Sequence, residues 1–271
     1  MFSTNAWLTS QTYNDQTSYL IRLDDNLDTL WTKRYFMNDS RAMFIATGII
    51  EEGNDFVAFG SGSTATSLSV GIMVRLDASG NKTFEKVITD PDKIIAVLNQ
   101  IPTPDGGYLI SGFADRDNPD VNAGSSREGY LLKVDASGNK EWDSVYKNPT
   151  FDGQNIVFWD MASAQDGNFL ILSQYASKIG SDGWVEEFDS YLMKINPQGE
   201  VIWNKYIDVG VGYSTNLGSV SEADDGTILL GGQSSIGGGQ LKGMFFKLTP
   251  LGEVLWEQYY WNSKKKVDKK S

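Results

Sequence analysis

Short apolar runs alternate with polar, glycine-containing turns along almost the whole chain. One pattern, an apolar run followed by a cation, a turn and a closing aromatic residue, occurs five times. The copies are YLIRLDDNLDTLW at 19–31, IMVRLDASGNKTF at 72–84, YLLKVDASGNKEW at 130–142, YLMKINPQGEVIW at 191–203 and MFFKLTPLGEVLW at 244–256. They follow one another at intervals of roughly 55 residues, and a repeat of this length indicates one supersecondary unit copied along the chain.

Each copy predicts a hairpin of two strands. Its consecutive apolar residues favour a strand that is buried on both faces. Glycine follows in four copies, at Gly80, Gly138, Gly199 and Gly252, where a tight hairpin requires a positive φ. The first copy has Leu27 at this position, so we expect its neighbour Asn26 to adopt the left-handed conformation there.

A second hairpin is predicted between successive copies. Turn sequences occur at 51–55, 104–108, 165–169 and 224–228, and an apolar run follows each of them. Four antiparallel strands per unit, with no segment of helical periodicity, predict an all-β fold, a β-propeller of four-stranded antiparallel blades.

The ends of the chain predict the number of blades. Four complete units run from about residue 19 to 242, half a unit follows, and residues 6–13 resemble the last strand of a unit. We therefore expect five blades, with the N- and C-terminal segments sharing one blade, because such sharing removes open sheet edges. The alternative is that the chain is part of a longer one. The expected organisation is a single propeller domain over 1–263 and a basic, disordered tail over 264–271.

The repeat resembles a known family. DGGYLISG followed by YLLKVDASGNKEWDSVY is similar to the β-propeller repeats of secreted and envelope proteins of bacteria, especially of the Bacteroidetes type. Its LD-x-x-G-x-x-x-W core, seen at Leu76, Asp77 and Gly80, is also similar to the docking motif of quinoprotein-like propellers. The resemblance implies an extracellular or cell-envelope location, although no signal peptide is visible in this chain. The motif is structural and implies no catalytic residue.

The amino-acid composition excludes several classes of function and of catalytic mechanism. The net charge of −12 disfavours binding to nucleic acid. The absence of histidine and cysteine excludes histidine-based triads, cysteine nucleophiles and histidine-ligated zinc or copper. No apolar stretch reaches the roughly 20 residues that span a bilayer. A two-carboxylate mechanism, as in glycoside hydrolysis, stays open.

Residues present in every copy are expected to be structural. The aromatic residues at 31, 84, 142, 203 and 256 would fill the space between neighbouring blades. The cations at 22, 75, 133, 194 and 247 would pair with acids on their own or the next blade, or else form a basic circle that holds an anion. Trp159 and Asp160 break the repeat, and we interpret them as part of the core.

Two insertions, at 114–128 and 176–190, are better candidates for function because the repeat does not explain them. The first offers a weak metal site, with calcium as the cation that its carboxylates suit, although Pro119 and a missing glycine depart from a calcium loop. Its candidate ligands are Asp115, Asp117 and Asp120. The second combines a tryptophan with carboxylates, as sugar sites do, although an ordinary acidic loop would look the same. Its candidate ligand-binding residues are Asp182, Trp184, Glu186, Glu187 and Asp189.

These patterns favour a non-enzymatic binding or scaffold propeller of the bacterial envelope or exterior. It would be a monomer without an identified cofactor, and its partner would be a carbohydrate or a protein. No catalytic residue is assigned. The alternative functions are a carboxylate-dependent glycoside hydrolase on a five-bladed propeller and a structural fragment of a larger surface protein.

Overall fold

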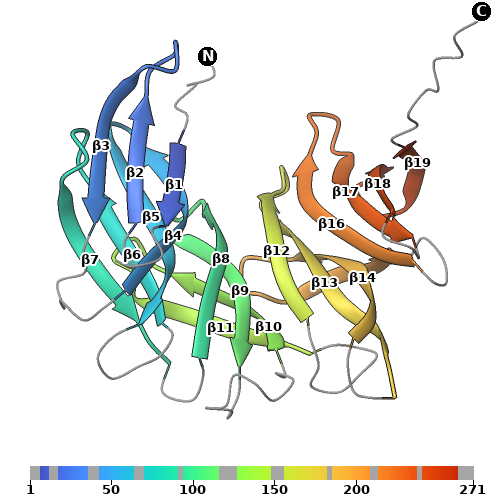
Figure 1. The fold of residues 1–271 in the computed structure, drawn as a ribbon. Helices are drawn as coiled ribbons and strands as arrows, with labels where there is room; N and C mark the ends of the chain where they lie inside the picture. Colours follow the sequence, from blue (N-terminus) through green and yellow to red (C-terminus); the bar gives the residue numbers. More distant parts are fainter. Residues whose placement is uncertain are drawn as a thin grey trace, which may run out of the picture. The chain divides into compact units, whose positions relative to one another are not determined.

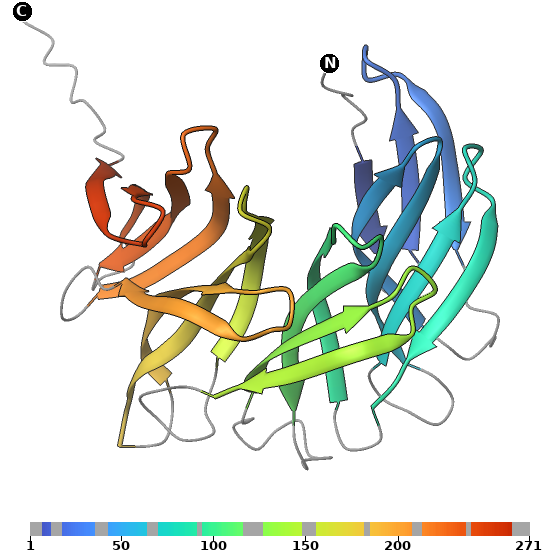
Figure 2. The same ribbon diagram turned by 180° about the vertical axis from the view of Figure 1, so that it is seen from behind.

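The computed structural model describes residues 7–11, 18–35, 43–63, 70–90, 94–115, 127–147, 156–181, 185–207, 213–236 and 240–261. These residues form 19 β-strands in five antiparallel sheets and contain no helix (Figures 1 and 2). The predicted fold class, an all-β chain of four-stranded antiparallel propeller blades, is confirmed. The chain divides into two compact units, Met1–Met161 and Ala162–Ser271, each of which is described by itself.

One sheet has three strands and four sheets have four strands, in chain order. The first sheet contains β1 (Trp7–Gln11), β2 (Ser18–Leu23) and β3 (Thr29–Tyr35). The second contains β4 (Met43–Glu52), β5 (Asp55–Ser63), β6 (Val70–Leu76) and β7 (Lys82–Ile88). The third contains β8 (Ile94–Pro102), β9 (Tyr108–Asp115), β10 (Arg127–Val134) and β11 (Lys140–Tyr146). The fourth contains β12 (Ile156–Ser163), β13 (Phe169–Ile179), β14 (Val185–Ile195) and β15 (Val201–Ile207). The fifth contains β16 (Tyr213–Glu222), β17 (Ile228–Ile236), β18 (Gln240–Leu248) and β19 (Val254–Trp261).

The grouping of hairpins into sheets differs from the expected one. Each repeated hairpin pairs with the hairpin before it in the chain, so β6 and β7 complete the sheet that β4 and β5 begin. The described strands at the two ends therefore belong to separate sheets: β1 pairs with β2, and β19 pairs with β18 in a complete four-stranded sheet. The prediction that the ends share one blade does not hold for these pairings. A periodic sequence gives the length of a unit but not its starting point, because a hairpin can pair in either direction.

The repeated hairpin turns depend on a side-chain cap and a left-handed residue. In the second sheet, a carboxylate oxygen of Asp77 accepts hydrogen bonds from the backbone N–H of Ser79 and of Asn81, at 2.9 and 2.8 Å. Gly80 then adopts a φ of 75°. The prediction for the first copy was wrong in its detail, because Leu27 itself, and not Asn26, has the positive φ, at 68°. The turn geometry fixes which position is left-handed, whatever residue stands there.

Two of the closing aromatic residues, Trp31 and Trp203, pack against the next hairpin, whereas the side chain of Phe84 is 36% exposed and Met73 and Lys86 lie at Gly138 instead. A Cβ atom on Gly80 would lie 2.8 Å from the ring of Trp31, and one on Gly252 would lie 3.0 Å from the ring of Trp203. The Trp31 indole N–H also donates to the carbonyl oxygen of Ala78 at 3.4 Å. The prediction that these aromatics fill the space between blades is confirmed for Trp31 and Trp203.

Replacing Trp203 with alanine should lower the free energy of unfolding by about 3–5 kcal/mol, because the ring fills the space between the fourth and fifth sheets. Trp256→Ala is the matched control: its side chain is 47% exposed, so we expect a loss below about 1 kcal/mol. Urea denaturation followed by circular dichroism measures both. Equal losses would contradict this account of the repeated aromatic position.

Candidate functional site

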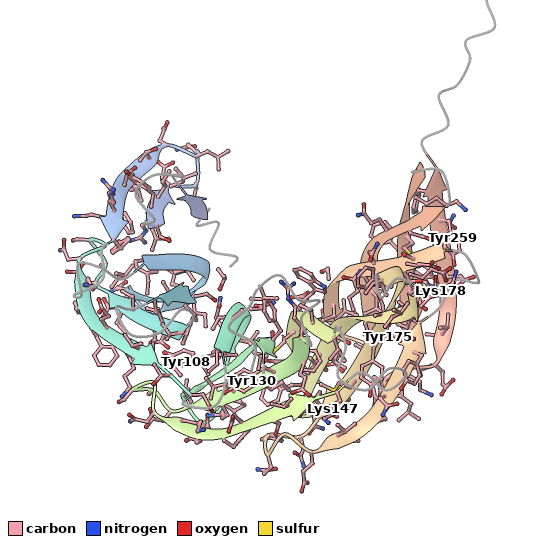
Figure 3. The ribbon with its side chains drawn as sticks, turned by 60° about the horizontal axis from the view of Figure 1, so that its bottom comes forward. Tyr108, Tyr130, Lys147, Tyr175, Lys178 and Tyr259 are labelled. Atoms are coloured by element: carbon pink, nitrogen blue, oxygen red, sulfur yellow. The ribbon has the colours of Figure 1, made fainter. Side chains whose placement is uncertain are left out.

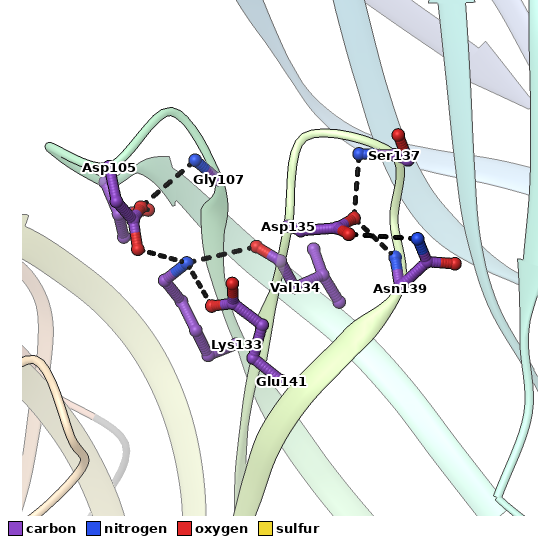
Figure 4. Close-up of polar contacts among 9 residues, drawn as sticks. Asp105, Gly107, Lys133, Val134, Asp135, Ser137, Asn139 and Glu141 are labelled. Carbon is purple, nitrogen blue, oxygen red and sulfur yellow. Dashed lines mark hydrogen bonds and ion pairs between the residues drawn. The ribbon is translucent and has the colours of Figure 1, made fainter.

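The repeated cations form ion pairs within their own sheets. In the third sheet, Lys133 Nζ lies 2.9 Å from Asp105 Oδ2 and 2.7 Å from Glu141 Oε2, and it also donates to the Val134 carbonyl (Figure 4). The Lys133 side chain is almost fully buried, so these acceptors replace its hydration shell. Burial opposes its charge, and the two carboxylates outweigh that effect and raise its pKa above the ordinary value.

The same arrangement recurs in three other sheets. Arg75 pairs with Glu52 at 2.7 Å, Lys194 with Asp166 at 2.7 Å, and Lys247 with Asp225 at 3.2 Å. This confirms the interpretation of these four cations as structural pairs. Each of their charges is neutralised by an acid of its own sheet, so these positions do not form an anion site.

Several predicted site residues lie outside the described residues. They are Asp117, Asp120, Asp182 and Trp184, and Asp115 is described only as the last backbone position of β9, opposite Arg127. Over the described residues, no group of three or more acidic side chains is placed to hold a metal ion. The calcium site therefore stays a prediction.

Glu186 and Glu187 come together on one lysine at the end of the β13–β14 hairpin. Lys178 Nζ lies 2.7 Å from Glu186 Oε2 and 3.4 Å from Glu187 Oε1. Hydrogen bonds to Glu186 first, and then to Glu187, raise the pKa of Lys178. The hairpin is held to the fifth sheet, because the Phe188 N–H donates to Ser214 Oγ at 3.1 Å.

Asp189 lies next on the same strand and is buried, directly opposite Tyr175. Glu187, Asp189 and Tyr191 alternate along β14, so their side chains share one face of the sheet. The structure thus gathers three of the five predicted ligand residues around the β13–β14 hairpin. Asp189 is buried, so it does not belong to the exposed groups of the hairpin.

A tyrosine cluster beside these carboxylates was missed in the sequence. The rings of Tyr175, Tyr191 and Tyr206 contact one another, with centroids 5.0 to 6.5 Å apart. Tyr175 and Lys178, both labelled in Figure 3, come from β13, and Tyr206 comes from β15. The sequence did contain one indication of this cluster. Tyr175 occupies a repeat position where other sheets have the small residues Gly62, Ala114 and Ser234.

Trp159 corrects another expectation. We interpreted it as core, but its side chain is 45% exposed on β12. An aromatic residue on a strand can point to either face of the sheet. The other copies of the repeat have no aromatic residue at this position that would have indicated which face it takes. Its neighbour Asp160 accepts a hydrogen bond from the Asn99 side-chain amide at 2.5 Å.

The β13–β15 face therefore combines three kinds of group: carboxylates, the ammonium group of Lys178 and an exposed ring. Tyr206 is 51% exposed and lies at one end, and the Lys178 pair lies at the other. Partial burial raises the pKa of Tyr206, so its hydroxyl stays protonated and can donate or accept a hydrogen bond near neutral pH. Such a face suits a ligand with many hydroxyl groups and one apolar side.

Comparisons with known proteins do not assign this chain to a family. No family model matches the chain, and no curated protein matches it significantly. Among solved structures, a luciferin-regenerating enzyme has a TM-score of 0.47 at 11% identity, over 95% of this chain and 76% of that one. A xylan β-1,4-xylosidase from Bacillus halodurans has a TM-score of 0.45 at 11% identity, over 91% and 51%. A mannose phosphorylase from Leishmania mexicana has a TM-score of 0.41 at 9% identity, over 89% and 78%. These are distant enzymes of the propeller type, and likeness at this level carries no function over.

The sequence contains no apolar stretch long enough to span a bilayer, and one structural finding bears on this point. In the part of the chain that the structure describes, no helix has the length and apolar character that crossing a bilayer requires.

The acid sensitivity of the repeated ion pair can be tested at Asp105. Hydrogen bonds from the Thr103 hydroxyl and from Lys133 lower the pKa of Asp105 from 3.8 to about 2. A carboxyl group with a lowered pKa stabilises the fold fully above its unfolded value and loses this effect as the pH falls through its folded value. Asp105→Asn should therefore destabilise the protein above pH 4, and the difference from wild type should shrink between about pH 4 and about pH 2. Melting temperatures across this range measure it, and Thr103→Val should give a smaller difference of the same sign. A difference that does not vary with pH would contradict the assignment.

Proposed function

We propose that this chain is a carbohydrate-binding β-propeller module and that the β13–β15 face is its binding surface. The observation that carries the proposal is the exposed ring of Tyr206 on the same sheet as two carboxylates held by Lys178. The apolar face of a sugar stacks on an aromatic ring, and its hydroxyl groups hydrogen-bond to carboxylates and to ammonium groups. Binding pockets for small ligands combine apolar and polar groups in this way.

The spacing of these groups favours an oligosaccharide. Glu187 and Tyr191 are four residues apart on β14, which is roughly 13 Å along a strand. Tyr206 lies directly opposite Tyr191 in the strand pairing, and Lys178 lies opposite Glu187. A ligand that contacts both ends must be longer than one sugar ring.

The test is a panel of soluble xylo-, manno- and cello-oligosaccharides, measured by isothermal titration calorimetry. We expect binding by the wild type and at least about tenfold weaker binding by Tyr206→Ala. Tyr259→Ala is the matched control, because Tyr259 has the same repeat position in the fifth sheet, and it should leave binding unchanged. Absence of binding to every sugar, or equal weakening by both variants, would reject the proposed surface.

The enzymatic alternative is a glycosidase that uses Glu187 and Asp189. These residues share a face of β14 two positions apart, roughly 7 Å between Cα atoms, which is close to the carboxyl separation of inverting glycosidases. The names of the xylosidase and the phosphorylase accord with this alternative better than with a non-enzymatic role. Release of reducing ends by the wild type, lost in both Glu187→Gln and Asp189→Asn, would establish the glycosidase and reject a purely binding role.

Trp184 and Asp182 belong to the same proposed site by sequence and lie outside the described residues, between β13 and β14. We expect Trp184→Ala to weaken binding of the best oligosaccharide while the melting temperature stays nearly unchanged, because the repeat that builds the sheets does not require a residue at this insertion. Differential scanning calorimetry and calorimetric titration measure the two effects. A large fall in melting temperature would place Trp184 in the core.

Bacterial origin and an extracellular or envelope location are part of this proposal and rest on the resemblance of the repeat. A non-enzymatic glycan-binding module on a cell exterior would need neither cofactor nor membrane span.

A further inference from the structure

The strand that carries Glu187 and Asp189 is hydrogen-bonded to the fifth sheet through the residues that alternate with them. Side chains alternate along β14, so Phe188 and Ser190 face β16, and Glu187 and Asp189 point to the opposite face. Both strands belong to the second compact unit, so this contact lies within one unit. Whatever holds β14 against β16 therefore also sets where the two carboxylates project.

Ser190 is fully buried and uses its hydroxyl twice. Its Oγ donates to the carbonyl oxygen of Thr215 at 2.9 Å and accepts from the N–H of Leu217 at 3.0 Å. Strand β16 has only β17 as a neighbour in its described sheet, so the backbone groups along its other edge need partners from elsewhere. Ser190 supplies both partners and fixes β14 against β16 at this level.

A second serine holds β14 two residues earlier. The Phe188 N–H donates to Ser214 Oγ at 3.1 Å. Phe188 lies in the insertion at 176–190, so the repeat does not require this contact. We call Ser190 and Ser214 the serine clamp, because they hold β14 on either side of Asp189.

The repeat supplies a structural counterpart for one half of the clamp. Ser18 has the repeat position of Ser190, and its Oγ accepts a hydrogen bond from the Ala46 N–H at 2.8 Å. In the other three sheets this position is glycine, at Gly71, Gly129 and Gly243. Sheets of this fold therefore form with or without the hydroxyl, and Ser18 offers the same kind of bond in a sheet that carries none of the predicted ligand residues.

The clamp adjoins every group of β14 that the proposed site uses. Glu187 precedes Phe188, and its carboxylate lies 3.4 Å from Lys178 Nζ, so a small shift of the strand would break this contact. Tyr191 follows Ser190, and its backbone pairs with that of Tyr206. Groups that bind a ligand must be held within about 0.5 Å of the productive arrangement, and supporting hydrogen bonds provide this.

We propose that Ser190 and Ser214 are positioning residues of the β13–β15 face. They hold Glu187, Asp189 and Tyr191 through the backbone of β14 and contact no ligand themselves. Affinity depends on them because a strand that is already fixed loses less conformational entropy when the ligand binds. This inference rests on the proposed carbohydrate-binding function.

The test compares Ser190→Ala and Ser214→Ala with the matched control Ser18→Ala. Each variant loses one hydroxyl that is hydrogen-bonded to the backbone of the next sheet, so we expect each melting temperature to fall. Calorimetric titration with the oligosaccharide that the wild type binds best should show at least about fivefold weaker binding by the two clamp variants and unchanged binding by Ser18→Ala. Ser214→Thr keeps the hydroxyl and should retain the wild-type affinity. Wild-type affinity in either clamp variant, or equal weakening by Ser18→Ala, would overturn the proposal.

A measurement without ligand separates this inference from the proposed function. Glu186 and Glu187 raise the pKa of Lys178, so an NMR titration of the Lys178 side chain reports whether Glu187 stays in place. Ser214→Ala should lower this pKa towards its ordinary value, and Ser18→Ala should leave it unchanged. If the wild type binds no oligosaccharide and the pKa falls in Ser214→Ala alone, the proposed function fails and the positioning role stands. An unchanged pKa in Ser214→Ala would reject the positioning role, whichever sugars bind.

Discussion

The structure depends on one constraint, the packing of the apolar residues of each sheet against the next, and at Gly80 and Gly252 an aromatic ring of one sheet lies over the hairpin glycine of the next. A sheet here has apolar residues on both of its faces, because its second and third strands contain runs of consecutive buried residues, such as Phe56–Phe59 and Val70–Val74. Such a sheet is stable only when both faces are covered, and consecutive sheets cover one another. The glycine lets the ring approach the backbone of the hairpin, and its positive φ closes the turn at the same time.

This packing decides what the repeated charges can do. Each lysine or arginine after the apolar run stands beside a buried strand, and an unpaired cation there would be costly. The turn of the preceding hairpin supplies an acid, as Asp105 does for Lys133 and Asp166 does for Lys194. The charged side chains of the repeat therefore pair with one another and stabilise the fold. Function has to be sought where the repeat is broken, as at Tyr175, Lys178 and the carboxylates of the β13–β14 hairpin.

The hairpin site illustrates what a sequence pattern can and cannot give. The insertion at 176–190 was visible as a departure from the repeat, and it pointed to Glu186 and Glu187, which the structure places together on Lys178. The partner Lys178 was inside the same insertion, yet its role depended on a bulge in β13 that changes the pairing between Ala176 and Lys178. Tyr206 could not be found from its own copy, because only its pairing with Tyr191 across β14 and β15 brings it to the proposed site.

The sequence by itself determined the repeat, the hairpins, the turn positions and the apolar runs that form the buried strands. These follow from local rules: apolar runs favour buried strands, glycine accepts a positive φ, and a type of residue that recurs at one position of the copies indicates a structural role. The tertiary structure decided which hairpin pairs with which, that Leu27 takes the left-handed position, that Trp159 is exposed and that Asp189 is buried. Those outcomes depend on which surface lies against which, and a periodic pattern is the same whether a hairpin pairs forward or backward and whether a face is covered or open.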